Sequence, residues 1–136
     1  MSNQIDVNQL SNALQQKVDL PSGKSQADID YVVEWQAPTS ENNYTWYRKY
    51  KSGWVEQGGK INSVTAYNTT VVKDLIIPMN DTNYSILGVM HTNGAGSYYY
   101  NTIVIRPEST STFRIGAGCS ESFILTWEVK GMAAQS

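Results

Sequence analysis

The stretch WYRKYKSGWVEQGG, residues 46–59, holds two tryptophans, two tyrosines and four charged side chains. Aromatic residues alternate with polar or charged ones on both sides of a Ser-Gly pair, which is the pattern of a β-hairpin with a tight turn. Packing within a hairpin explains this composition better than a ligand platform does. The interpretation predicts that Trp54 is buried, so that its removal would destabilise the fold.

A two-residue Ser-Gly turn also predicts the register of this hairpin. Lys49 would face Glu56 and Arg48 would face Gln57, and both are favourable cross-strand pairs. The glycines at 58–59 indicate a bulge or the close approach of another segment.

Further strands are expected on both sides of the hairpin. Seven to eight short segments, separated by turn signals about every ten residues, predict an all-β fold, an antiparallel sandwich or barrel. The expected strands are 30–35, 43–51, 54–61, 69–79, 84–91, 98–107, 109–118 and 121–131. The segment 37–43 between the first two is a turn-rich loop.

The first thirty residues differ from the rest, because they contain no aromatic residue and are rich in Gln, Asn, Ser and Asp. Val7, Leu10 and Leu14 follow a helical spacing, which predicts a helix of about three turns before a polar connector. Two readings stay open: a helix that frays or lies on its own domain, and a short parallel coiled coil between copies of the chain. The chain therefore divides into residues 1–30 and a β domain of residues 31–136.

Composition excludes several classes of function. The 136 residues carry ten Lys and Arg against twelve Asp and Glu, a net charge of −2, without the basic excess of a nucleic-acid-binding protein. The densest apolar run, 75–79, is far too short for membrane insertion. The N-terminus lacks the apolar core of a signal peptide, so we expect release by lysis or a piece of a longer chain. The lone Cys119 permits no intrachain disulfide.

Candidate catalytic and metal-binding groups are few. His91 is the only histidine and has no neighbouring ligand, so neither a zinc site nor a nucleophilic triad is expected. Carboxylates are better explained as solvated ion pairs than as a glycosidase pair; those considered are Glu34, Glu56, Asp74, Glu121 and Glu128. The sequence predicts no enzyme, no metal and no cofactor.

The segment HTNGAGSYYYN, residues 91–101, is the better candidate for ligand binding. Its polar, glycine-containing tip buries little, and neighbouring residues of a strand face opposite sides, so at least one tyrosine points away from the core. Exposed tyrosines beside Asn and Ser suit sugars or polar macromolecules. The alternative is that Tyr98 and Tyr100 line a subunit interface. The candidate contact residues are His91, Asn93, Tyr98, Tyr99 and Asn101.

Four motifs of this sequence resemble the C-terminal receptor-binding heads of bacteriophage and prophage tail fibres. They are WYRKYKSGWVEQGG (46–59), VVKDLIIPMNDTNYSILG (71–88), TSTFRIG (110–116) and WEVKG (127–131). Residues 10–29 are similar to the linkers that join the fibre shaft to such heads. The sequence lacks the His-x-His triplets of metal-threaded fibre tips.

The resemblance implies an antiparallel β-sandwich that forms a homotrimer and binds a bacterial surface glycan or protein without catalysis. It implies location at the fibre tip of the virion, joined to the upstream shaft. The motif residues would determine the fold rather than contact the receptor; they are Trp46, Arg48, Tyr50, Gly53, Trp54, Glu56 and Gln57. The alternatives are a purely structural fibre or baseplate component and a glycan-cleaving tailspike module.

Overall fold

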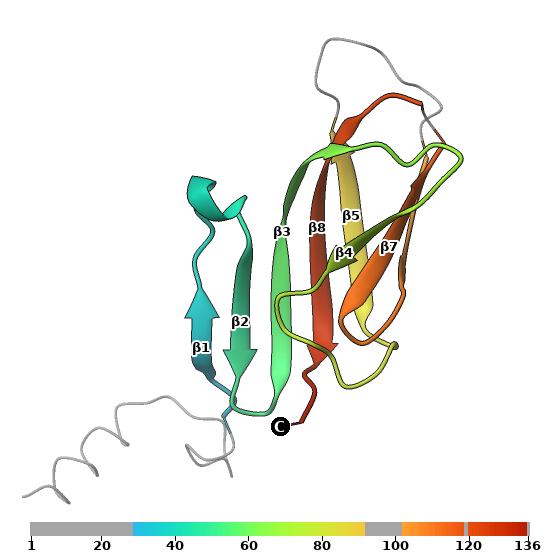
Figure 1. Cartoon of the computed structure of the whole chain (residues 1–136). Helices are drawn as coiled ribbons and strands as arrows, with labels where there is room; N and C mark the ends of the chain where they lie inside the picture. The colour runs from blue at the N-terminus through green and yellow to red at the C-terminus, as the bar shows by residue number, and fades with distance from the viewer. Residues whose placement is uncertain (1–28, 92–101, 119, 136) are drawn as a thin grey trace, which may run out of the picture. The chain divides into compact units, whose positions relative to one another are not determined.

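The computed structural model describes residues 29–91, 102–118 and 120–135, and within these ranges the chain is almost entirely β (Figure 1). A short 3-10 helix, η2 (Ser40–Asn42), interrupts the strands. The strands are β1 (Val32–Gln36), β2 (Trp46–Tyr50), β3 (Trp54–Val64), β4 (Val71–Asp74), β5 (Ser85–His91), β6 (Ile103–Pro107), β7 (Thr112–Ala117) and β8 (Phe123–Met132). The predicted all-β class is confirmed, and the predicted N-terminal helix lies outside the described residues.

Two antiparallel sheets pack face to face as a sandwich. The larger sheet has the order β1-β2-β3-β8-β5 and the smaller one the order β4-β7-β6. Alternate residues of β8 point between the sheets, where the Trp127 and Phe113 rings lie 5.0 Å apart. The buried core is Val64, Ala66, Leu75, Met79, Tyr84, Phe113, Ile115, Phe123, Leu125, Trp127 and Val129.

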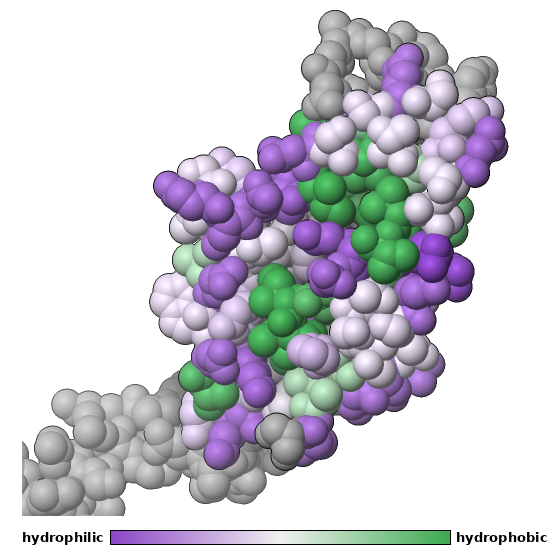
Figure 2. All heavy atoms as spheres, viewed as in Figure 1, coloured by the Kyte–Doolittle hydropathy of each residue, from purple (hydrophilic) through white to green (hydrophobic). Residues whose placement is uncertain are grey.

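The strands β1 and β2 extend beyond the sandwich, because the smaller sheet lies over the other three strands of the larger one (Figure 1). We call these two strands the flange. Four of the five residues of β1 are exposed, and β2 contributes no fully buried side chain. The side of the flange in view in Figure 2 carries mostly polar and weakly apolar residues.

The hairpin register differs from the predicted one by one residue. Arg48 faces Glu56 and Lys49 faces Val55, so the turn contains the three residues 51–53. Gly53 adopts a φ of +93°, and its N–H donates to the Tyr50 carbonyl at 2.9 Å. A three-residue turn that ends in a positive-φ glycine closes the hairpin here, and the sequence alone did not distinguish it from a two-residue turn.

The predicted burial of Trp54 is wrong. Its side chain lies on the outer face of the larger sheet and is 37% exposed. Trp54 is exposed because side chains alternate along β3. Val55 and Gln57 point into the sandwich, while Trp54 and Glu56 point out.

The close approach expected at residues 58–59 is confirmed. A Cβ atom on Gly58 would lie 2.6 Å from the Trp127 carbonyl oxygen and 2.7 Å from Nε1 of Trp46. The Trp46 indole therefore rests against the bare backbone of β3. The bulge in this strand lies farther along, between Ile61 and Val64.

The expected strand 69–79 is shorter than predicted, because only Val71–Asp74 pair in the smaller sheet. The fully buried side chain of Gln57 hydrogen-bonds to the backbone of the residues that follow β4. Its Nε2 donates to the Ile77 carbonyl at 2.7 Å, and its Oε1 accepts from the N–H groups of Ile76 and Ile77 at 2.8 and 2.9 Å. Side-chain hydrogen bonds thus take the place of backbone pairing at Ile76 and Ile77, while Leu75 and Met79 donate to the Ser111 and Thr110 carbonyls.

The antiparallel order places the finishing ends of β1, β3 and β5 at one end of the sandwich. This end lies opposite Val32, where β1 begins, and we call it the distal end. Within the described ranges no helix has the length and apolar character required to cross a bilayer.

Candidate functional site

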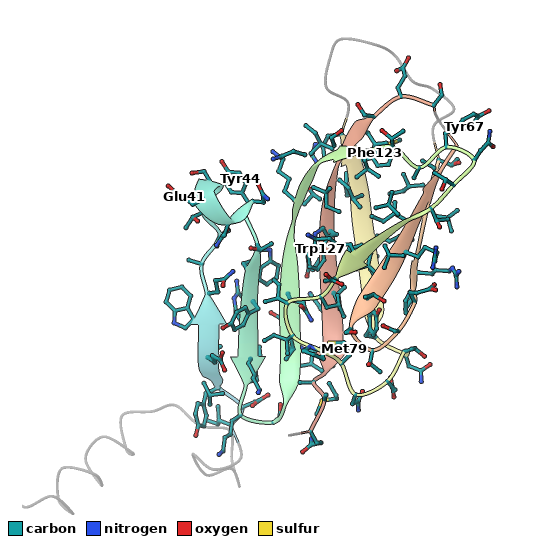
Figure 3. The ribbon with its side chains drawn as sticks, viewed as in Figure 1. Glu41, Tyr44, Tyr67, Met79, Phe123 and Trp127 are labelled. Atoms are coloured by element: carbon teal, nitrogen blue, oxygen red, sulfur yellow. The ribbon has the colours of Figure 1, made fainter. Side chains whose placement is uncertain are left out.

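Three described segments lie at the distal end. Figure 3 shows Glu41 and Tyr44 at the tip of the loop that contains η2, and Tyr67 on the connection after β3. The third is the end of β5 at His91. Loops carried by a rigid β scaffold are where recognition residues concentrate, so this end is the candidate functional site.

His91 is the one predicted contact residue that the structure describes. It closes β5 on the outer face of the larger sheet, is exposed, and its Nε2 lies 3.1 Å from Oγ1 of Thr126. A single hydroxyl partner on a neighbouring strand fixes the position of the ring and leaves its other edge open to solvent.

The other predicted contact residues, Asn93, Tyr98, Tyr99 and Asn101, lie outside the described residues. The segment 92–101 that contains them connects β5, the edge of the larger sheet, to β6, the edge of the smaller one. Its attachment to His91 places the start of this connection at the distal end.

The loop around η2 is ordered by its own hydrogen bonds. Thr39 and Asn42 form a reciprocal capping box: Thr39 Oγ1 accepts from the Asn42 N–H, and Asn42 Oδ1 accepts from the Thr39 N–H at 3.0 Å. Hydrogen bonds from its own backbone N–H and from the Thr39 and Ser40 hydroxyls hold the pKa of Glu41 below its usual range. The site therefore presents a carboxylate that stays ionised in mildly acidic solution.

Backbone conformation in the same loop is unusual. Asn43 and Tyr44 both have positive φ angles, 56° and 57°, a region that bulky residues rarely occupy. The Asn43 carbonyl accepts from the Lys60 N–H at 3.2 Å, and the Lys60 Nζ lies 5.5 Å from the centre of the Tyr44 ring. These contacts with β3 hold the exposed Tyr44 in a strained conformation, which is common where side chains are positioned for recognition.

Sequence reasoning took 37–43 as a turn-rich loop, the next candidate for receptor contact after 91–101, and missed Tyr44 and Lys60 as a pair. The sequence signal was the Thr-x-x-Asn spacing of residues 39–42 followed by Asn43, a residue that tolerates positive φ. Nothing in the sequence indicated that Tyr44 shares this conformation, because tertiary contacts with β3 impose it.

The carboxylates of the larger sheet are paired with basic or hydroxyl groups. Glu128 lies 3.0 Å from Lys130 and Glu56 lies 3.6 Å from Arg48, as exposed ion pairs. Glu34 accepts from the Tyr47 hydroxyl at 2.8 Å, and this bond is the main cause that raises the Tyr47 pKa. Within the described residues no three His, Cys, Asp or Glu side chains converge in a way that would hold a metal ion.

Comparison with known proteins gives a likeness of fold. No family model matches the sequence. No curated protein matches it either. An N-truncated R2-type pyocin tail fibre aligns with 74% of this chain at a TM-score of 0.51 and 18% identity. A C-terminal fragment of the R2 pyocin fibre of P. aeruginosa aligns equally well, at a TM-score of 0.51 and 17% identity.

The chain spans 39% and 26% of those two solved chains. At this identity the likeness establishes the fold alone. The fold expected from the resemblance to tail-fibre heads is therefore confirmed, and it is shared with the fibre of an R2 pyocin.

Proposed function

We propose that this chain is the receptor-binding head of a tail fibre, acting as a non-enzymatic homotrimer at the fibre tip. The observation that carries the proposal is the fold shared with R2 pyocin tail fibres. Sequence motifs that resemble phage fibre heads point to the same role independently. The ligand is a glycan or a protein on the surface of a bacterium.

We propose that the receptor-facing surface lies at the distal end. The preceding residues enter the sandwich at Val32, and a shaft that ends there leaves the opposite end free to meet a cell. The segment 92–101 is the first candidate and the η2 loop with Tyr44 is the second. Both follow the finishing ends of strands, and recognition residues concentrate in loops carried by a rigid scaffold.

Exposed apolar residues on both sheets support association of several copies. Leu87 and Val89 lie exposed on the outer face of β5, and Val72 and Val104 lie exposed on the smaller sheet. Apolar patches on two different faces suit a ring in which one face of a copy contacts another face of the next.

Adsorption to cells tests the proposal. Fluorescently labelled full chain is incubated with a panel of bacterial strains, and bound protein is measured by flow cytometry with competition by unlabelled chain. We expect saturable binding to a subset of strains. Absence of adsorption to every strain would favour the alternative, that the chain is a purely structural fibre component.

A second measurement separates binding from cleavage. Surface polysaccharide from an adsorbing strain is incubated with the chain, and release of reducing sugar is followed over time. We expect none above a heat-denatured control. Steady release would favour the glycan-cleaving alternative.

A further inference from the structure

A cleft of about 290 Å³ lies on the flange, next to the distal end. Its lining residues come from the end of β1, the following turn and the start of β2; they are Trp35, Gln36, Ala37, Pro38, Trp46 and Arg48. This volume is at the lower end of the range of small-molecule sites, about 300–1,000 Å³. The cleft therefore fits a single ring of a ligand rather than a long chain.

The cleft is aromatic on two sides because of the strand register. Trp35 is paired with Arg48 across β1 and β2, and Trp46 lies two residues from Arg48 on the same face. Trp35 is 68% exposed, although tryptophan is among the residues whose burial contributes most to stability. An indole left this open at the edge of a sheet is a ready stacking surface.

The Trp46 ring is fixed in place before any ligand arrives. It rests against Gly58, where a Cβ atom would approach its ring atoms to 2.7 and 2.9 Å. The Arg48 guanidinium lies 5.6 Å from the ring centre on a cation–π contact. A preorganised aromatic wall loses little conformational entropy on binding.

Arg48 supplies the charge of the cleft. Its nearest acidic partner is Glu56, at 3.6 Å, which is longer than a hydrogen bond, and its side chain is 55% exposed. A guanidinium carries five N–H donors in a planar fork that matches a carboxylate. Arg48 can therefore donate hydrogen bonds to an anionic group of a ligand on the side that faces the cleft.

We infer that this cleft binds an acidic sugar unit, a pyranose that carries a carboxylate, within the surface glycan of the target bacterium. The apolar face of the ring stacks on Trp35, and the carboxylate pairs with Arg48 beside Trp46. A cleft lined only by aromatic residues would take a neutral sugar equally well, so Arg48 sets the preference for an acidic one. The inference rests on the proposed function and names the ligand chemistry of a second contact surface beside the loops.

The test uses the full chain and a hexuronic acid oligosaccharide, with the carboxyl-reduced neutral oligosaccharide as the matched probe. Binding is measured by titration of tryptophan fluorescence and by calorimetry. We expect Trp35→Ala and Arg48→Gln each to weaken binding of the acidic probe about tenfold or more, with Arg48→Lys intermediate. Lys51→Gln removes an exposed positive charge from the nearby hairpin turn, outside the cleft; it is the control and should bind like wild type.

Several outcomes would overturn the inference. They are equal affinity for the acidic and neutral probes, wild-type binding by Trp35→Ala, and a change of oligomeric state in Trp35→Ala. The last would mean that a second copy covers the cleft. Cell adsorption separates the two proposals. If the wild-type chain adsorbs to cells and Trp35→Ala adsorbs equally well, the cleft proposal alone is refuted. A wild-type chain that binds the acidic probe but no cell refutes the proposed function alone.

Discussion

At the scale of single residues, Gln57 connects the two sheets through its side chain. It satisfies the N–H groups of Ile76 and Ile77 and the Ile77 carbonyl from a fully buried position. Gln57→Leu keeps the volume but removes every donor and acceptor, leaving three backbone groups without this partner. Since an unsatisfied buried group costs about 1–3 kcal/mol, we expect a loss of roughly 3 kcal/mol or more in the free energy of unfolding.

Urea denaturation measures this loss. The control is Asn62→Ala, which removes one exposed side-chain hydrogen bond of 3.5 Å to Asn43 and should change stability by less than about 0.5 kcal/mol. If Gln57→Leu unfolds at the wild-type urea concentration, the segment 75–79 is held by apolar packing and not by this side chain.

Gly58 offers a second prediction at this scale. The Cβ atom of Gly58→Ala would meet the Trp127 carbonyl, a rigid backbone group, at 2.6 Å, and the Trp46 indole on its other side. We expect a loss of about 1–3 kcal/mol from overpacking. Tryptophan fluorescence should also change as Trp46 moves.

A matched glycine is available on the other sheet. At Gly116 the nearest atom to a new Cβ is Cγ2 of Thr70, at 3.9 Å, which is ordinary contact. Gly116→Ala should therefore melt close to wild type. Equal melting temperatures for the two alanine variants would contradict the close packing of Trp46 on β3.

At the scale of elements, Tyr84 fastens the start of β5 to the turn between β6 and β7. Its hydroxyl donates to the carbonyl oxygens of Thr112 and Ser109, at 2.7 and 3.0 Å. Burial is the main cause that raises the Tyr84 pKa, and the nearby Glu108 carboxylate adds to it. In the unfolded chain the pKa of tyrosine is about 10.

Because the folded pKa is the higher one, the stabilising contribution of the neutral phenol is present below about pH 10 and is lost as pH rises through the folded pKa. Tyr84→Phe should lose about 1 kcal/mol near pH 8 and show a shallower alkaline decline than wild type. Urea titrations from pH 8 to 11 check this, with the exposed Tyr67→Phe as the control. Parallel declines in wild type and Tyr84→Phe would contradict it.

The elements also show what the sequence could predict. The existence of the strands followed from alternation and turn spacing. Each of the eight expected strands has a counterpart among the described residues, although β4 is shorter than predicted. The predicted burial of Trp54 was wrong, because side chains alternate along β3 and Val55, not Trp54, points into the sandwich. The buried role of Gln57 was not visible, since its partners are backbone groups about twenty residues away.

The candidate site was less predictable than the fold. Alternating aromatics in the hairpin suggested packing, and Trp46 does pack on Gly58, but Trp35, on the same outer face of the edge strand β1, is 68% exposed. Whether an aromatic residue on this outer face is packed depends on the size of the residue opposite it on the next strand. Local alternation carries no information about that size.

At the scale of the whole molecule, we predict a homotrimer at micromolar concentration. The spacing of Val7, Leu10 and Leu14 predicts a helical seam, and the apolar residues on the outer faces of both sheets supply contact area. Light scattering and native mass spectrometry should give three times the mass of one chain. Removing residues 1–24 should weaken the trimer while circular dichroism of the β domain is retained. A full chain that is monomeric under these conditions contradicts the prediction.

The last prediction places cell recognition on the segment 91–101. A polar tip with two glycines is expected from the sequence to contribute little to the core, so we predict that Asn93, Tyr98 and Tyr99 contact a receptor without supporting the fold. Alanine at each of these positions should reduce adsorption to a susceptible strain while the melting temperature and the oligomeric mass stay at wild-type values. Tyr44→Ala, on the second candidate loop of the same end, is the comparison variant. If the three variants of 91–101 adsorb normally and Tyr44→Ala does not, recognition belongs to the η2 loop, whose strained tyrosine is held ready by Lys60.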